Sequence, residues 1–312
     1  MKPNTNTNQD LRHDGKEGYA RRFLSVVKKN YSAWLIILPS IIVFYFFVWR
    51  PLLIGISMSF FRLKGFTPTE FVGLKNYFDV IRNTLFLKTL GNTMSYVFWS
   101  LIIGALPPFI IAIMVNEAVH LKGYFKFAMY FPAIIPSIAV SMIWYYLYQP
   151  GDGGILNMLL GKLGLGASAW LQNSSMTIPL IVISMTWRGC GATMVMYLAT
   201  LQGINQELYE ATRIDGAGFF RRIRYVTIPH MSGVLLLLLI RQIISVFQIL
   251  EQPLAMTGGG PNYASLSLSL QTYNYNFVYG QTDKALATGG ITFALLLILT
   301  VIYFQVDKKI SD

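Results

Sequence analysis

Six polar or aromatic side chains stand inside otherwise apolar runs, and these are the residues that could do chemistry. They are Trp187, Arg188, Arg241, Gln242, Gln248 and Glu251. Burying such groups in lipid is costly unless they face a cavity or a partner. Arg241 and Gln248 are seven positions apart, so they would share one face of a helix. In a purely structural interpretation, Glu251 neutralises the surroundings of the two arginines, or the arginines snorkel to an interface.

A second concentration of polar residues is the interval LYEATRIDGAGFFRRIRYVTIPH, residues 208–230. Asn205 is a good N-cap for a helix that carries Glu210 near its positive end. Gly216 is expected to stop this helix as a C-cap. A second, amphipathic helix follows, and Pro229 is expected to end it. The sequence therefore predicts a loop that holds a fixed shape.

Patterns for catalysis and metal binding are missing from the sequence. His13, His120 and His230 are scattered, and Cys190 is a lone cysteine, so we expect no metal site, disulfide or catalytic residue. No G-x-x-x-x-G-K-[ST] motif occurs, so an ATP-binding P-loop is not predicted. A glycine-rich run at 164–169 mimics a dinucleotide fingerprint but has no preceding strand, and no cofactor is expected.

The elements that position these residues are predicted to be membrane-spanning helices. Of the 312 residues, 54% are hydrophobic and 12% are charged, about half the charged fraction of a soluble domain. Six stretches are long and apolar enough to span a bilayer as helices. They are Ala33–Phe60, Leu90–Val115, Phe127–Tyr148, Ile178–Leu201, Met231–Leu250 and Ala285–Phe304. The net charge of +11 does not indicate nucleic-acid binding, because no soluble fold is left to present it.

The distribution of Lys and Arg predicts that both termini are cytoplasmic. With that orientation the cytoplasmic segments hold 15 of these residues and the external segments hold seven. The chain then divides into four parts. They are a basic cytoplasmic leader (1–30), a first span with an external segment (31–85), a five-helix core (86–306) with the cytoplasmic loop 203–230, and a tail (307–312).

The cytoplasmic loop closely resembles the EAA motif of bacterial ABC importer permeases. The resemblance rests on Glu210-Ala211-Thr212, then Gly216, then Val226-Thr227-Ile228-Pro229 at fixed spacing. Asp215-Gly216-Ala217 is as expected for the carbohydrate branch, whereas Thr212 replaces the usual second alanine. Segments 71–77, 201–204 and 257–261 are similar to further landmarks of sugar permeases.

This resemblance implies a type I importer architecture in which transport, ATP hydrolysis and sugar capture belong to different subunits. The chain would be a multi-pass transport subunit, not an enzyme, in the bacterial cell membrane. Its partners would be a second homologous permease, two copies of a cytoplasmic ABC ATPase and an extracytoplasmic sugar-binding protein. The residues implied to dock the ATPase are Glu210, Ala211, Asp215, Gly216 and Ala217.

The resemblance also gives the polar residues within the spans a candidate role. A sugar path, most simply for an oligosaccharide, needs aromatic rings that stack on pyranose faces and amides that pair with hydroxyls, as Trp187 and Gln248 could. The alternative is a self-contained channel or secondary transporter. That alternative predicts an inverted repeat and ionisable groups at mid-membrane, and we find no such repeat.

Overall fold

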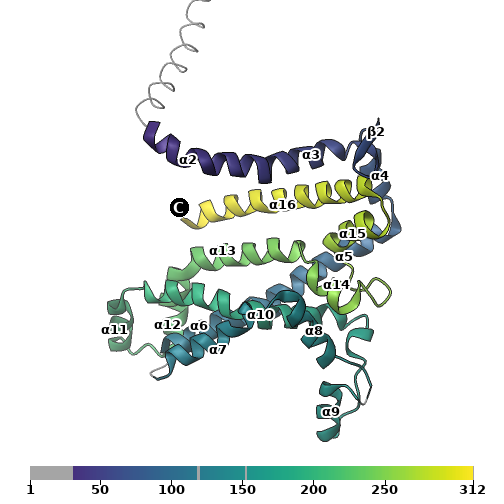
Figure 1. Cartoon of the computed structure of the whole chain (residues 1–312). Coiled ribbons are helices and arrows are strands. Elements are labelled where there is room, and N and C mark those ends of the chain that lie inside the picture. Colours follow the sequence, from purple (N-terminus) through teal and green to yellow (C-terminus); the bar gives the residue numbers. More distant parts are fainter. Residues whose placement is uncertain (1–30, 118–119, 152, 312) are drawn as a thin grey trace, which may run out of the picture. The chain divides into compact units, whose positions relative to one another are not determined.

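The computed structural model describes residues 31–117, 120–151 and 153–311, with side chains up to residue 306 (Figure 1). The predicted leader, residues 1–30, lies outside the described residues, as do the side chains of the predicted tail. Contacts divide the chain into two compact units, residues 1–57 and 58–312. Each unit is described by itself below.

The first unit contains one long apolar helix. It consists of α2 (Tyr31–Phe44), the π turn η1 (Tyr45–Trp49) and the start of α3 (Arg50–Met58). These pieces form a continuous helix of 28 residues with a mean hydropathy of 2.1, long enough to cross a membrane. The first predicted span is therefore present, and Arg50 lies within it.

The second unit begins with a β-hairpin and a short helix before its long helices. A hairpin of β1 (Phe61–Lys64) and β2 (Thr67–Phe71) is antiparallel, with an irregularity between Arg62 and Leu63. An Arg62–Glu70 ion pair of 2.7 Å joins its strands. The helix α4 (Lys75–Ile81) follows. This hairpin is the only strand pairing within the described ranges, so the fold is otherwise helical.

The remaining elements are helices and short helical turns. Before the polar loop they are α5 (Thr84–Trp99), η2 (Ser100–Gly104), α6 (Leu106–Glu117), α7 (Lys122–Ile134), α8 (Ser137–Leu147), α9 (Ile155–Lys162), η3 (Trp170–Gln172) and α10 (Thr177–Gln202). From the polar loop onward they are α11 (Gln206–Ile214), α12 (Phe219–Arg222), η4 (Ile223–Thr227), α13 (Ile228–Phe247), α14 (Glu251–Thr257), α15 (Leu268–Tyr273), η5 (Asn274–Val278) and α16 (Thr282–Ser311).

The third predicted span is not one continuous helix. Five helical segments of the described chain are long and apolar enough to span a membrane, and the sixth span exists only as the pair α7 and α8, bent by 95°. Ile135 has an extended backbone with ψ of 134°. The residue before a proline avoids helical geometry, and here Pro136 follows it directly. The break places two helix ends within the third predicted span.

The prediction that Pro229 ends the second loop helix was wrong. The helix runs without interruption from Phe219 to Phe247 through the π turn η4. Pro229 lies inside this continuous helix, in the first turn of α13. The wider π turn directly before it accommodates the proline ring. At its other end this span stops at Phe247, before the predicted Leu250, and α14 begins at Glu251.

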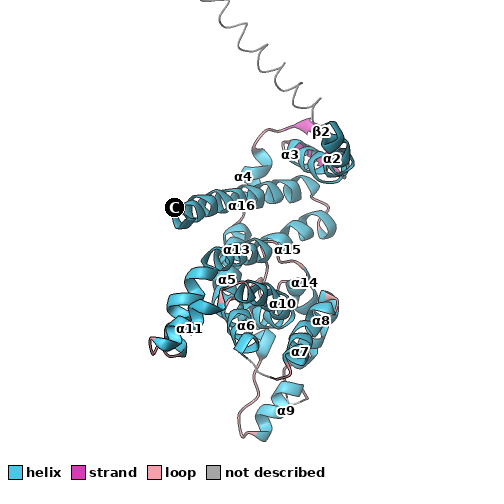
Figure 2. Cartoon of the chain, turned by 90° about the vertical axis from the view of Figure 1, so that its left-hand side faces the viewer, coloured by secondary structure: helices cyan, strands magenta, loops and turns pink. Residues whose placement is uncertain are grey.

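The core of the second unit is built around α10, which packs against α6, α7, α5 and α13 (Figure 2). Met194, Tyr197 and Leu201 of α10 are buried in one cluster with Ala112 of α6 and Met231 of α13. The closest approach is to α7, because a Cβ on Gly191 would lie 2.6 Å from the Cα of Tyr130. A side chain at this position would therefore separate the two helices.

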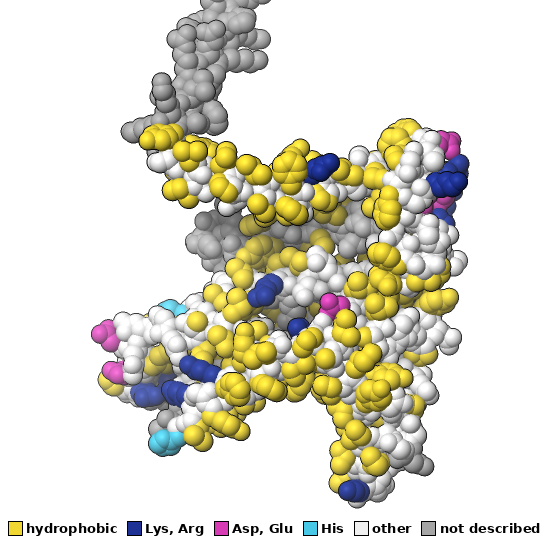
Figure 3. All heavy atoms as spheres, viewed as in Figure 1, with side chains coloured by type: hydrophobic (Ala, Val, Ile, Leu, Met, Phe, Trp, Pro, Cys, Tyr) yellow, Lys and Arg dark blue, Asp and Glu magenta, His cyan; other side chains and the backbone are white. Residues whose placement is uncertain are grey.

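The two ends of the second unit carry different elements. The loop helix α11 and the final turns of α16 lie at the same end of the unit, and α4 and α15 lie at the opposite end (Figure 1). On the face shown in Figure 3, charged side chains gather at both ends of the unit, over α11 and α12 at one end and over the hairpin at the other.

Candidate functional site

The helix α11 is capped at both ends, as the sequence predicts. The Asn205 side chain accepts a hydrogen bond of 3.0 Å from the Glu207 N–H. At the other end Gly216 has a φ of 74°. The N–H groups of Gly216 and Ala217 donate to the carbonyls of Arg213 and Thr212, at 3.0 and 2.9 Å. This is the glycine C-cap with its paired bonds, and both cap predictions are confirmed.

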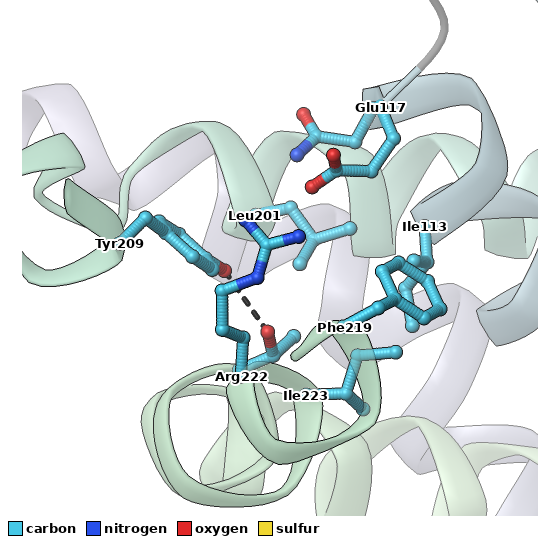
Figure 4. Close-up of a pocket in the computed structure, with 9 residues that line it drawn as sticks. Ile113, Glu117, Leu201, Tyr209, Phe219, Arg222 and Ile223 are labelled. Atoms are coloured by element: carbon cyan, nitrogen blue, oxygen red, sulfur yellow. Dashed lines mark hydrogen bonds between the residues drawn. The ribbon is translucent and has the colours of Figure 1, made fainter. Parts of the chain in front are cut away.

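A small cleft lies at the base of α11, where the loop packs against the membrane helices (Figure 4). The Tyr209 hydroxyl lies 3.0 Å from the Thr227 Oγ1 of η4 and forms a hydrogen bond with it. Phe219 and Arg222 of α12 line the same cleft, together with Leu201 at the end of α10. Residues of α10, α12 and η4 thus surround the base of α11, and the fixed shape of the loop stays a prediction.

We expect Tyr209→Phe to loosen α11 while the rest of the fold stays intact. The substitution removes one hydroxyl and its hydrogen bond to Thr227, a loss of about 1 kcal/mol. Amide hydrogen exchange should become about fivefold faster in residues 206–214, because local opening sets the exchange rate. Tyr225→Phe is the control, since Tyr225 is 69% exposed. Equal exchange in both variants would show that this bond does not hold the loop.

The outer face of α11 has no partner within the described chain. Tyr209 and Thr212 are half-buried and face the membrane helices, whereas Glu210 and Ala211 are exposed. Ile214 is 87% exposed, which is unusual for a large aliphatic side chain at a helix end. Glu210 forms no hydrogen bond or ion pair with any other described residue. An apolar side chain beside an unpaired acid is a surface suited to another protein.

The remaining residues of the predicted docking set lie at the same tip. Asp215 and Gly216 are exposed, and Ala217 is half-buried. They form the corner between α11 and α12, so the loop turns sharply there. The structure thus brings all five predicted docking residues onto one projecting segment.

Arg188 and Glu251 each take part in one hydrogen bond at the break between α7 and α8. The Arg188 Nε donates to the Ile135 carbonyl at 3.1 Å, so a cation satisfies a carbonyl at the end of α7. Ser137, the first residue of α8, donates from its hydroxyl to the Glu251 carboxylate. The helices α8 and α14 pack side by side from this point. The two predicted path residues therefore bind Ile135 and Ser137, which lie on the two sides of the break.

The structure separates Gln242 from this pair. Its Nε2 donates to the Ser100 carbonyl at 2.6 Å, and Gly104 gives it room because a Cβ there would collide with the amide. Gln242 therefore joins α13 to the π turn η2. Arg241 is exposed, and its Nη1 contacts the Met196 sulfur of α10 at 3.2 Å.

The last two predicted path residues are exposed at different places. Gln248 follows the end of α13 and caps it. Trp187 lines an apolar cleft of about 380 Å³ with Trp144 and Met129. The two indole rings are 6.0 Å apart and edge to face. Sequence reasoning missed Trp144 and Ser137, because neither breaks the apolar pattern of its helix.

The described residues contain no group of three or more histidine, cysteine, aspartate or glutamate side chains placed to hold a metal ion. Arg188 and Glu251 instead form hydrogen bonds to residues on the two sides of a helix break. The arrangement therefore offers hydrogen bonds and fixed charge rather than bond-making chemistry.

Comparison with known proteins agrees with this geometry. Residues 119–312 match the family described as the binding-protein-dependent transport system inner membrane component. The chain is 31% identical to the trehalose/maltose transport system permease protein MalF of Thermococcus litoralis, over 89% of this chain and 94% of that protein. It is 30% identical to the arabinooligosaccharides transport system permease protein AraP of Bacillus subtilis, over 89% of each.

Among solved structures, the chain resembles one of a bacterial ABC transporter involved in the import of the acidic polysaccharide alginate. The TM-score is 0.81 at 23% identity, over 93% of this chain and 100% of the other. This likeness confirms the predicted fold class, the helical permease of a type I ABC importer. The chain belongs to the family of binding-protein-dependent transport system inner membrane components, and it is a multi-pass transport subunit.

Proposed function

We propose that this chain forms half of the translocation path of an ATP-driven sugar importer and passes force from a cytoplasmic ATPase through α11. The observation that carries the proposal is the capped helix α11, which projects an unpaired acid and an exposed isoleucine. A helix that must transmit a conformational change has to be fixed to the spans on one face and free to bind on the other. The structure of α11 meets both requirements.

The docking surface in this proposal is Glu210, Ala211, Asp215, Gly216 and Ala217. Glu210 pairs with a basic group of the ATPase, and the Gly216 corner sets the angle at which α11 enters a cleft of that partner. Ala211 leaves space for close approach. Two ATPase copies, a second homologous permease and an extracytoplasmic binding protein complete the assembly, as the family description already requires a binding protein.

In this proposal α11 lies in the cytoplasm together with both chain termini. In support, α11 and the end of α16 lie at one end of the second unit (Figure 1), and basic residues are concentrated in the segments assigned to that side. Residues 86–306 then form the permease core, with 203–230 as its coupling loop. Residues 31–85 contribute a first span and an external segment.

The sugar path in this proposal runs past the break between α7 and α8. Arg188 and Glu251 supply charge there. Three exposed residues add to the path: Trp187, which precedes Arg188 on α10, Gln248 at the end of α13, and Arg241 earlier in α13. Gln242 does not contact the sugar in this proposal, because its side chain joins α13 to η2 through the hydrogen bond to Ser100. Relatives named for trehalose, maltose, lactose and arabinooligosaccharides support an oligosaccharide as the substrate.

The test is uptake of radiolabelled saccharides by liposomes that hold this chain with its second permease and ATPase. We expect uptake of trehalose, maltose, lactose or arabinotriose that requires both ATP and the sugar-loaded binding protein. Liposomes without the ATPase should take up none. Uptake by this chain alone would instead support a channel or secondary transporter and would overturn the proposal.

A further inference from the structure

We infer that a cavity at the end of α8 and α14 away from α11 binds one uncharged ring of the transported saccharide, an inference that rests on the proposed sugar import. The cavity has a volume of about 440 Å³. Three segments distant in sequence form it: the end of α8, the turn η3, and the end of α14 with the glycine-rich turn after it. It is separate from Arg188 and Trp187, which do not line it.

Two carboxamides in this cavity are free to bind a ligand. Gln149 is half-buried and Gln172 is exposed, and neither side chain forms a hydrogen bond with another described residue. Each amide can donate two hydrogen bonds and accept others, as sugar hydroxyls require. The neighbouring hydroxyl of Thr257 is already engaged, because it donates to the Pro253 carbonyl at 2.9 Å. The glutamines are therefore the groups left to recognise a solute.

An aromatic wall faces the same space. Tyr148 is buried between Trp144 and Trp170, with ring centroids 5.2 and 5.7 Å away, so its ring is held in place. Tyr145, one turn earlier in α8, is 40% exposed at the cavity. The face of an aromatic ring carries partial negative charge and attracts the polarised C–H groups of a pyranose. None of the described residues that line the cavity is charged, which favours an uncharged ring over an ion.

The position of the cavity relates it to the proposed path. The helices α8 and α14 begin together at the Ser137–Glu251 contact and end together at the cavity. Ser137 and Tyr145 are eight residues apart on α8, a rise of about 12 Å. In the proposed topology the cavity lies on the outer side of the break. An entering saccharide would therefore meet the glutamines and tyrosines before it reaches Arg188.

The test measures direct binding of sugar to the assembled transporter without its binding protein. The probe is whichever of trehalose, maltose, lactose and arabinotriose the wild-type transporter takes up best. Tryptophan emission reports occupancy, since Trp144 and Trp170 pack against the cavity wall. We expect the double variant Gln149→Ala/Gln172→Ala to raise the Kd about tenfold through the loss of two hydrogen bonds. Tyr145→Ala should also raise it, whereas the control Tyr146→Ala should not, because Tyr146 does not line the cavity.

Each outcome of this experiment either supports the cavity site or overturns it. Gln172→Asn is the variant to use if the double substitution prevents assembly, since Gln172 is exposed. An unchanged Kd in the glutamine variants overturns the cavity site and leaves sugar import standing. A change only in the binding-protein concentration needed for transport shows a protein contact and also overturns the site. A wild-type transporter that imports none of the four sugars overturns both proposals.

Discussion

Gly191→Ala is expected to destabilise the fold more than alanine at any other glycine of the long spans. The new Cβ would collide with the backbone of α7 at Met129 and would lie 2.6 Å from the Cα of Tyr130. Backbone atoms of a packed helix cannot move aside as a flexible side chain can, so α10 and α7 would have to separate. We expect a loss of about 3 kcal/mol.

The measurement is thermal unfolding of the detergent-solubilised protein, followed by the amount of monodisperse protein after heating. Gly189→Ala is the matched control. It lies two residues away in the same helix, and its added Cβ would meet nothing within 4 Å. The control should unfold at the wild-type temperature or slightly above it, because alanine favours helix over glycine. If both variants unfold together, the close contact of α10 with α7 is not important for stability.

Glu210→Ala is expected to abolish the coupling of sugar to ATP hydrolysis while the permease itself folds normally. Glu210 is exposed and has no partner within the described chain, so its loss costs the permease little. A charge pair buried in a protein interface is different, because truncating one partner costs about 2–5 kcal/mol of binding. We expect sugar-stimulated ATP hydrolysis by the assembled transporter to fall by at least about tenfold.

Glu207→Ala is the control for this prediction. Glu207 is an exposed acid on the same helix, in its first turn, and it is not part of the proposed docking surface. The control should keep sugar-stimulated hydrolysis, and both variants should unfold at the wild-type temperature. An equal loss of activity in both variants would mean that general negative charge, rather than Glu210, attracts the ATPase.

The coupling loop could be predicted from sequence because its signals are local. The Asn205 cap, the Gly216 corner and the fixed spacing between them act within one or two helical turns. Pro229 shows where this reasoning failed. A proline ends a helix in water, but a π turn placed before it, together with packed neighbours, lets a membrane helix continue. The sequence of η4 contains no signal from which this π turn could be predicted.

The site at the α7–α8 break was harder to predict because it depends on distant residues. Pro132 and Pro136 both follow apolar residues, yet Pro132 lies inside α7 and Pro136 follows the break. What distinguishes the second position is a partner for the Ile135 carbonyl, which Arg188 supplies from α10. Likewise Gln242 is used between helices because Gly104 leaves room for it, and such pairings appear only once the helices are packed.

The central claim, that α11 is the surface on which the ATPase docks, is tested most directly by photo-crosslinking. A photoreactive amino acid at Ile214, which is 87% exposed at the end of α11, should crosslink to the ATPase in the assembled transporter. The same group at Phe277, which is 71% exposed in the turn η5 directly after α15, should not, because α15 and α11 lie at opposite ends of the second unit (Figure 1). Crosslinking to the ATPase from position 277 but not from position 214 would contradict the account.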